Sequence, residues 1–139
     1  MMNYKKIAVA IDFSKQSLKA LDRAITIAKD NSATLLLVNV VDTKTFGSIA
    51  AYDLKYAAQL KIESETKLDQ LKKQALEEGV SAVETLVVEG SPKEILTNLP
   101  EIELIICGET GYNQIEKMML GSVAERIVRY SKYDVLIVR

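Results

Sequence analysis

Three glycines and a serine near the C-terminus have the spacing of a loop that holds phosphate. Gly108 and Gly111 follow the short apolar run at residues 105–107, and Gly121-Ser122 comes after nine further residues. Glycine lets the backbone turn sharply and approach a ligand closely, while loop N–H groups and a helix N-terminus attract an anion. We therefore expect a nucleotide site here, with a helix that begins at Ser122.

The side-chain inventory excludes many catalytic mechanisms. The chain has no histidine and one cysteine, Cys107. Serine or cysteine nucleophiles activated by histidine, and the common histidine metal sites, are therefore excluded. A single cysteine cannot form an internal disulfide, which agrees with a reducing compartment.

Length and charge limit the class of protein. A chain of 139 residues that is 48% hydrophobic is long enough for one two-sided core and too short for two ordinary domains, so we expect a single domain over residues 1–139. The formal net charge of -1 provides no overall attraction to nucleic acid or to an anionic membrane. The N-terminus holds no apolar stretch long enough for a signal sequence or a membrane span, and we expect a cytoplasmic protein.

Short apolar runs alternate with helical patterns along the chain. The runs are continuous, as in parallel strands covered on both faces, and we expect strands at 6–11, 35–41, 83–88, 104–107 and 135–138. We expect helices at 14–30, 52–78, 91–99 and 122–130. Because parallel strands need crossover helices, this alternation predicts an α/β fold: a single open, doubly wound, parallel five-stranded sheet with helices on both faces.

Local signals add detail to these elements. Ser14 is expected to cap the first helix, whose apolar stripe on the sheet is predicted to be Leu18, Leu21, Ile25 and Ala28. Ser91 and Glu94 have capping-box spacing at the start of the third helix. The run at 83–88 is more polar, as in an edge strand, and residues 42–51 read as a loop, either a lid or a plain connection.

Three residues at strand ends are expected to meet in one crevice. In open α/β sheets ligands bind at the carboxyl ends of the strands, where the winding reverses. Asp12, Val40 and Gly108 end or follow three of the expected strands. They are therefore candidates for the walls of the nucleotide site.

These residues resemble the universal stress protein family, of the ATP-binding type, over essentially the whole chain. The signature is Gly108, two residues, Gly111, nine residues and then Gly121-Ser122. The opening run that ends in Asp12-Phe13-Ser14, the run at 37–42, the helix start at 121–128 and the closing run at 135–138 are also similar to the family pattern. The resemblance implies a Rossmann-like fold, of the adenine nucleotide alpha hydrolase-like kind.

The resemblance also implies a ligand and the residues around it. The ligand would be ATP with Mg²⁺ or Mn²⁺, and since the sequence shows no acidic cluster, the nucleotide would bring the ion and no protein metal ligand is expected. The residues bordering adenine and ribose would be Ala10, Ile11, Asp12 and Val40. Those along the ribose and phosphates would be Gly108, Thr110 and Gly111, and those holding the phosphates would be Gly121, Ser122, Val123 and Ala124.

The family relation further implies a homodimer that works as a nucleotide-dependent stress-response or signalling module. In relatives the last strand pairs with its copy, and here that strand is an apolar edge made of Val135, Leu136, Ile137 and Val138. Tyr133-Asp134 stands where relatives often have Cys-Pro. No nucleic acid or membrane partner is expected, and the protein partner is unknown.

Other functions stay open at this point. The chain could be a nucleotide-free dimerisation or chaperone-like member of the family, or an AMP-binding sensor that uses the same pocket. The three signature glycines favour nucleotide binding, because members that lack binding usually lose one or more of them. No Walker lysine motif and no residue to position an attacking water is evident, so we expect no enzyme, or at most slow ATP hydrolysis.

Each candidate residue also has a purely structural interpretation. Ser122 and Glu125 have the spacing of a capping box, so Ser122 could serve only the helix N-terminus. Asp12 could bind a turn amide, and Cys107 is expected to be a small buried hydrophobe.

Overall fold

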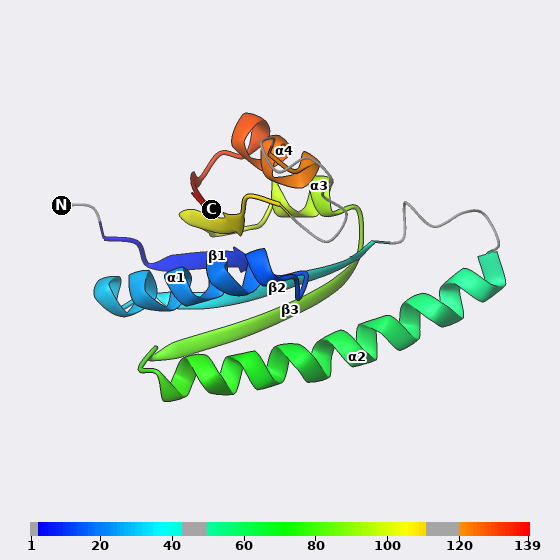
Figure 1. The fold of residues 1–139 in the computed structure, drawn as a ribbon, viewed down its shortest axis with the longest axis horizontal. Helices are drawn as coiled ribbons and strands as arrows, with labels where there is room; N and C mark the ends of the chain where they lie inside the picture. The colour runs from blue at the N-terminus through cyan, green and yellow to red at the C-terminus, as the bar shows by residue number, and fades with distance from the viewer. Residues whose placement is uncertain (1–2, 43–49, 111–119) are drawn as a thin grey trace.

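The computed structural model describes residues 3–42, 50–110 and 120–139, and the side chains of these residues except those of 50–54. Strands and helices alternate through the described chain (Figure 1). The elements are β1 (Lys6–Ala10), α1 (Lys15–Asn31), β2 (Thr34–Asp42), α2 (Ala50–Glu77), β3 (Ala82–Gly90), α3 (Pro92–Leu96), β4 (Leu104–Gly108), α4 (Ser122–Tyr130) and β5 (Asp134–Val138). Every expected strand and helix is present.

The strands form one open parallel sheet in the order β3-β2-β1-β4-β5. All the neighbouring pairs, β1 with β2 and β4, β2 with β3, and β4 with β5, run parallel. The chain winds outward from β1 to β3 and then returns to the other side of β1, so the winding reverses between β1 and β4. The predicted doubly wound α/β fold is confirmed, with β3 and β5 as the edge strands.

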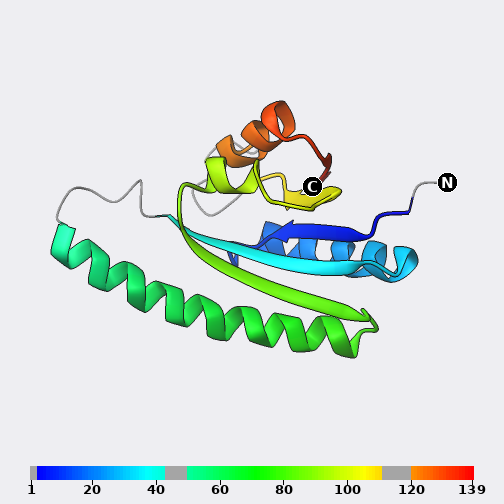
Figure 2. The same cartoon turned by 180° about the vertical axis from the view of Figure 1, so that it is seen from behind.

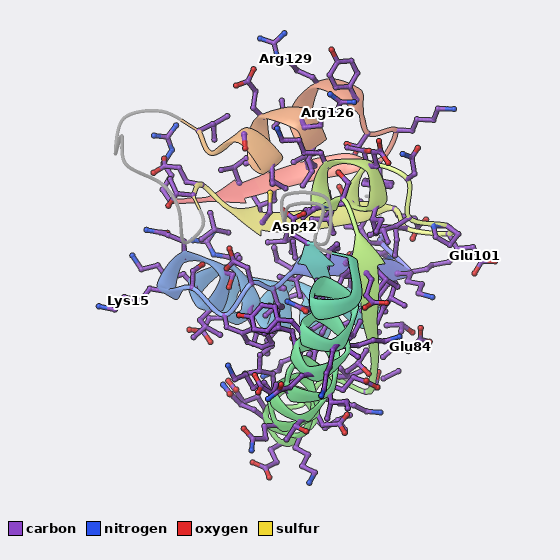
Figure 3. The ribbon with its side chains drawn as sticks, turned by 90° about the vertical axis from the view of Figure 1, so that its right-hand side faces the viewer. Lys15, Asp42, Glu84, Glu101, Arg126 and Arg129 are labelled. Atoms are coloured by element: carbon purple, nitrogen blue, oxygen red, sulfur yellow. The ribbon has the colours of Figure 1, made fainter. Side chains whose placement is uncertain are left out.

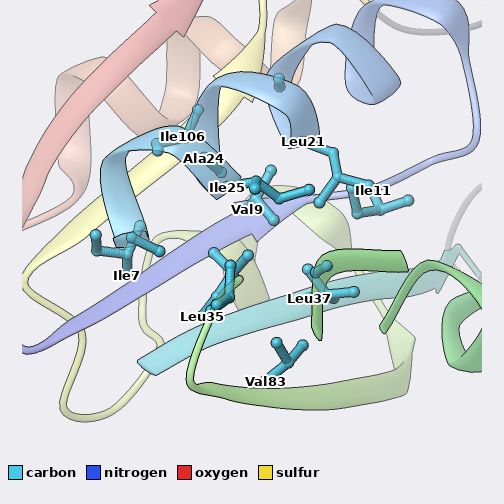
Figure 4. Close-up of a cluster of buried hydrophobic side chains, with 14 of the residues drawn as sticks. Ile7, Val9, Ile11, Leu21, Ala24, Ile25, Leu35, Leu37, Val83 and Ile106 are labelled. Carbon is cyan, nitrogen blue, oxygen red and sulfur yellow. The ribbon is translucent and has the colours of Figure 1, made fainter. Parts of the chain in front are cut away.

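Helices cover both faces of the sheet (Figures 1 and 2). The side chains of β1 alternate between two cores: Ile7, Val9 and Ile11 pack on the side of α1 and α2 (Figure 4), while Ala8 and Ala10 face α3 and α4. Because Ala8 and Ala10 are small, the side that faces α3 and α4 has space at the carboxyl end of this strand.

Helix α1 is capped as expected, and three of the four residues of its expected stripe, Leu21, Ile25 and Ala28, are buried. The Ser14 hydroxyl accepts a hydrogen bond from the Ser17 N–H at 3.2 Å, and Ser32 ends the helix in a left-handed conformation. The fourth expected residue, Leu18, is 37% exposed. Its neighbour Ser17 is buried instead, and the Ser17 hydroxyl donates to the Ser14 carbonyl and accepts from the Asp12 N–H. The buried residues are Ser17, Ala20, Leu21, Ala24, Ile25 and Ala28.

Helix α3 is shorter than predicted and lacks the expected capping box. Ser91 occupies the N-cap without a side-chain hydrogen bond, and the helix ends at Leu96 rather than near Leu99. Side chains beyond its end bond the carbonyls of the helix: the Thr97 hydroxyl donates to the Lys93 carbonyl at 2.7 Å. The Asn98 amide donates to the Glu94 carbonyl at 2.8 Å in the same way.

The long helix α2 packs along β2 and β3 and extends past the carboxyl end of the sheet (Figure 1). It begins at Ala50, so the last two residues of the loop expected at 42–51 are helical, while 43–49 lie outside the described residues. Gly79, at φ 113°, turns the chain away from the helix end toward β3. No helix in the described part of the chain is long and apolar enough to cross a membrane.

Candidate functional site

A cavity of about 680 Å³ opens at the carboxyl ends of β1, β2 and β4. Its walls come from these strand ends and from the starts of α3 and α4, on the sheet face that carries both helices. This is the point between β1 and β4 where the winding reverses, the usual ligand position in an open α/β sheet.

The cavity gathers the site residues predicted from sequence. Ten of them line it: Ala10, Ile11, Asp12, Val40, Gly108, Thr110, Gly121, Ser122, Val123 and Ala124. The remaining one, Gly111, lies outside the described residues. Four segments that are far apart in sequence therefore converge on one cavity.

The start of α4 presents backbone donors to this cavity that have no acceptor among the residues the structure describes. Gly121 is the N-cap residue, and no described side chain makes a cap hydrogen bond there. The N–H groups of the first helical turn have no acceptor within a helix, so those of Ser122, Val123 and Ala124 are available to a ligand. Together with the positive end of the helix dipole, they make this wall of the cavity suited to an anion.

Ser122 does not form the capping box that its spacing with Glu125 permits. It is the first residue of α4 rather than the residue before it, so its hydroxyl cannot reach back over the first turn. The Glu125 carboxylate instead pairs with Arg129 at 3.1 Å on the exposed side of the helix. Figure 3 shows Arg126 and Arg129 on the outer side of α4, whereas Ser122 lines the cavity.

Glu109 holds the two ends of the glycine loop together. Its carbonyl accepts a hydrogen bond from the Gly121 N–H at 2.9 Å, and its own N–H donates to the Val138 carbonyl at 2.9 Å. Its carboxylate lies 3.5 Å from the Arg139 guanidinium. The end of β4, the start of α4 and the end of β5 are therefore bonded to one residue.

Helix packing explains the glycine at position 108, which the sequence alone did not indicate. A Cβ atom at this position would lie 2.9 Å from the backbone carbon and oxygen of Gln16, in the first turn of α1. Contacts this short do not occur between real side chains and backbone, so helix α1 could not approach β4 as it does. The glycine is needed for helix packing, whatever it does for a ligand.

Asp12 accepts a hydrogen bond from a turn amide, as its structural interpretation predicts. Its Oδ1 atom accepts from the Ser14 N–H at 3.0 Å and from the Ser14 hydroxyl. The following residue, Phe13, has a φ of 64°, a conformation that non-glycine residues adopt rarely. Oδ2 of Asp12 makes no hydrogen bond with the residues that the structure describes, and Asp12 lines the cavity. One oxygen thus fixes the turn and the other is available.

Several residues of the cavity were not predicted. Val38 lies two residues before Val40 on β2 and so faces the same side, a relation that strand periodicity could have given. Ser91, Pro92 and Lys93 follow the carboxyl end of β3, at the edge of the sheet where the other candidates lie. The unpredicted lining residues are Ser17, Val38, Asp42, Ser91, Pro92, Lys93, Leu96, Cys107 and Glu109.

Cys107 and the acidic residues limit the chemistry of the cavity. Cys107 is buried, and burial raises the pKa of its thiol to about 12, so it is neutral and unreactive at physiological pH. Among the described residues, no group of three or more Cys, Asp or Glu side chains has the geometry to hold a metal ion. The described part of the cavity wall therefore offers neither a reactive thiol nor a cluster of metal ligands.

A family model ties this architecture to known proteins. The model of the universal stress protein family matches residues 3–139. The chain belongs to the universal stress protein family. A universal stress protein of Staphylococcus saprophyticus is 41% identical over 143 residues, an alignment that covers 100% of this chain and 86% of the relative.

Solved universal stress proteins have the same fold. The protein UspA from Lactobacillus plantarum has a TM-score of 0.92 at 23% identity, with 100% of both chains covered. A universal stress protein solved in complex with cAMP has a TM-score of 0.76 at 30% identity, with 99% of both chains covered.

Tyr133, directly before the last strand, bonds to the end of α3. The Tyr133 hydroxyl donates to the Leu96 carbonyl and accepts from the Leu99 N–H at 3.2 Å. Burial raises the pKa of this hydroxyl, so it keeps its proton and remains a donor. Asp134, the next residue, accepts from the Tyr4 hydroxyl at 2.6 Å. Tyr133 and Asp134 therefore anchor the end of α3 and the N-terminal segment.

Proposed function

We propose that this protein binds an adenine nucleotide, ATP with Mg²⁺ or Mn²⁺, in the cavity between α3 and α4. The observation that carries the proposal is the convergence of the predicted signature residues on one cavity beside the uncapped start of α4. Its volume of about 680 Å³ falls within the range of about 300–1,000 Å³ typical of small-molecule sites. The cAMP complex of a universal stress protein at 30% identity adds support, because cAMP is an adenine nucleotide.

In this proposal the nucleotide lies along the cavity with its base at the strand ends. Adenine and ribose contact Ala10, Ile11 and Val40, and the available oxygen of Asp12 accepts a hydrogen bond from a hydroxyl or amino group of the ligand. The ribose and phosphates run past Gly108, Thr110 and Gly111. The backbone N–H groups at Gly121, Ser122, Val123 and Ala124, with the Ser122 hydroxyl, hold the phosphates.

The divalent cation arrives on the phosphates. The described residues offer no cluster of acidic side chains for a protein-held ion, and Mg²⁺ commonly keeps several waters while it binds phosphate oxygens. The ion neutralises part of the phosphate charge. The chain then needs only backbone donors and few charged side chains at this end of the site.

The protein acts as a binding module rather than an enzyme. It forms a homodimer through Val135, Leu136, Ile137 and Val138 of the edge strand β5, works in the cytoplasm, and signals through a surface that changes with nucleotide occupancy. The described cavity holds no histidine base and no activated thiol, so hydrolysis is at most slow.

Calorimetric titration with ATP and Mg²⁺, beside AMP, tests the proposal after any bound nucleotide has been stripped and identified. We expect saturable ATP binding near one per chain, clearly tighter than AMP. Gly121→Val should abolish it, because a β-branched side chain obstructs the phosphate path. Gly121 has φ -62° and ψ 155°, which valine also adopts, so the variant should fold.

Other outcomes would replace the proposal. Failure of the folded wild-type protein to bind either nucleotide would favour the nucleotide-free dimerisation or chaperone-like alternative. AMP binding as tight as ATP would favour an AMP sensor. Unchanged affinity in Gly121→Val would remove the start of α4 from the site.

A further inference from the structure

The charged side chains that line the cavity differ in whether they interact with other residues of the protein. Asp12 bonds Ser14, Glu109 pairs with Arg139, and Asp42, at the end of β2 (Figure 3), also makes an interaction. Lys93 lines the same cavity and forms no ion pair with any residue that the structure describes. In the described part of the cavity wall, Lys93 is the one cation, and its charge is unpaired.

The position of Lys93 is fixed by the body of the protein. Helix α3 packs against α4 (Figures 1 and 2), and its Leu96 side chain is buried in the core on that face. The Lys93 carbonyl accepts from the Thr97 hydroxyl at 2.7 Å, and the Tyr133 hydroxyl holds the Leu96 carbonyl. The lysine backbone is therefore held in a helix that packs against α4, and its side chain is exposed at the cavity wall.

We propose that Lys93 is a specificity-determining residue of this cavity, which selects ligands that carry phosphate charge. The inference rests on the proposed function and adds to it a residue outside the glycine signature. Without Lys93, the described charged side chains on the wall are all carboxylates, Asp12, Asp42 and Glu109, and they oppose an anionic ligand. With it, an ammonium on a flexible stem can follow the phosphates that the backbone of α4 holds.

This assignment separates two contributions to recognition. The backbone donors at the start of α4 provide fixed hydrogen bonds, which need a phosphate in one position. The ammonium of Lys93 provides a charge that acts over several ångströms and weakens as salt is added. Adenosine, which has no phosphate, gains nothing from Lys93, whereas ATP does.

Titration of four forms of the full chain with ATP and Mg²⁺, and separately with adenosine, tests the inference. The forms are wild type, Lys93→Met, Lys93→Arg and the control Lys73→Met, which changes an exposed lysine of α2 away from the cavity. We expect Lys93→Met to bind ATP about fivefold more weakly, the effect of one partly exposed ion pair, with adenosine affinity unchanged. Lys93→Arg and Lys73→Met should bind ATP like wild type, and the deficit of Lys93→Met should shrink at high salt.

Two results would overturn the inference while leaving the proposed function in place. Wild-type ATP affinity in Lys93→Met would mean that the ammonium does not act on the ligand. An equal loss for adenosine and ATP would mean that the side chain packs against the nucleoside and does not read charge. By contrast, a folded wild-type protein that binds neither ligand would reject the nucleotide proposal and this inference with it.

Discussion

Gly108 and Ser122 belong to one motif but are explained by different features of the structure. A side chain at position 108 would collide with the backbone of Gln16, so the fold itself requires a glycine there. The presence of Gly108 alone therefore does not indicate a ligand. Within the described residues Ser122 makes no capping hydrogen bond, and it lines the cavity, so helix formation does not explain its position. The serine and the free N–H groups beside it are therefore the more informative part of the signature.

Replacement of Gly108 by alanine should destabilise the fold. The added Cβ would lie 2.9 Å from the Gln16 backbone, and because backbone cannot rotate away, α1 must shift on the sheet. We expect the free energy of unfolding to fall by about 1–3 kcal/mol, measured by urea denaturation. Ser122→Ala, an exposed change in the same cavity, is the control and should stay within about 0.5 kcal/mol of wild type. Equal stability of Gly108→Ala and wild type would show that α1 adjusts freely.

At the scale of elements, hydrophobic periodicity was sufficient to predict the order and type of the strands and helices. Continuous apolar runs such as residues 35–41 can only be satisfied in a sheet covered on both faces. What failed depends on rotation about a helix axis or on single rotamers: Leu18 is exposed, and Ser91 forms no capping box. Such details are decided by tertiary contacts that no local pattern contains.

The sequence also predicted part of the lining of the candidate cavity. The predicted lining residues lie on or beside the glycine signature and at the ends of β1 and β2, because topology brings strand ends together. Lys93 was missed because the signals around it predict only a helix start, while the anchor of that helix, Tyr133, lies forty residues further along the chain. Long-range anchors of this kind leave no periodic signal.

Tyr133→Phe tests that anchor. The variant removes the donor to the Leu96 carbonyl and the acceptor for the Leu99 N–H while keeping the ring. Loss of these bonds from half-buried groups should lower the free energy of unfolding by about 1–2 kcal/mol, followed by thermal and urea unfolding. Tyr130→Phe, which changes an exposed tyrosine of α4, should have no measurable effect. If both variants were equally stable, the α3 anchor would contribute nothing.

For the whole molecule, the open sheet leaves two edges, and they differ in character. The edge strand β3 carries Glu84, Thr85 and Glu89 among its apolar residues, while β5 is apolar from Val135 to Val138 and only its last residue is buried. Exposed apolar edges favour pairing with another strand, and this difference is the basis for placing the proposed dimer at β5.

Val135→Lys should disrupt the proposed dimer. A charge on the half-buried first apolar residue of β5 would be desolvated by a second copy, so sedimentation equilibrium should give twice the 15.4 kDa chain mass for wild type and a single chain mass for the variant. Val128→Lys, at a 49% exposed position on α4, is the matched control and should remain dimeric. A wild-type protein that sediments as a single chain would contradict the dimer.

The two backbone hydrogen bonds of Glu109 bear on how the proposed dimer and the proposed ligand would influence each other. Because its carbonyl holds Gly121 and its N–H holds Val138, the end of β5 cannot move without moving the start of α4. Binding equilibria joined in this way are reciprocal: if ligand tightens association of two chains by some factor, association must tighten ligand by the same factor. Dilution of the protein would then lower its apparent affinity for ligand, although no residue of the cavity had changed.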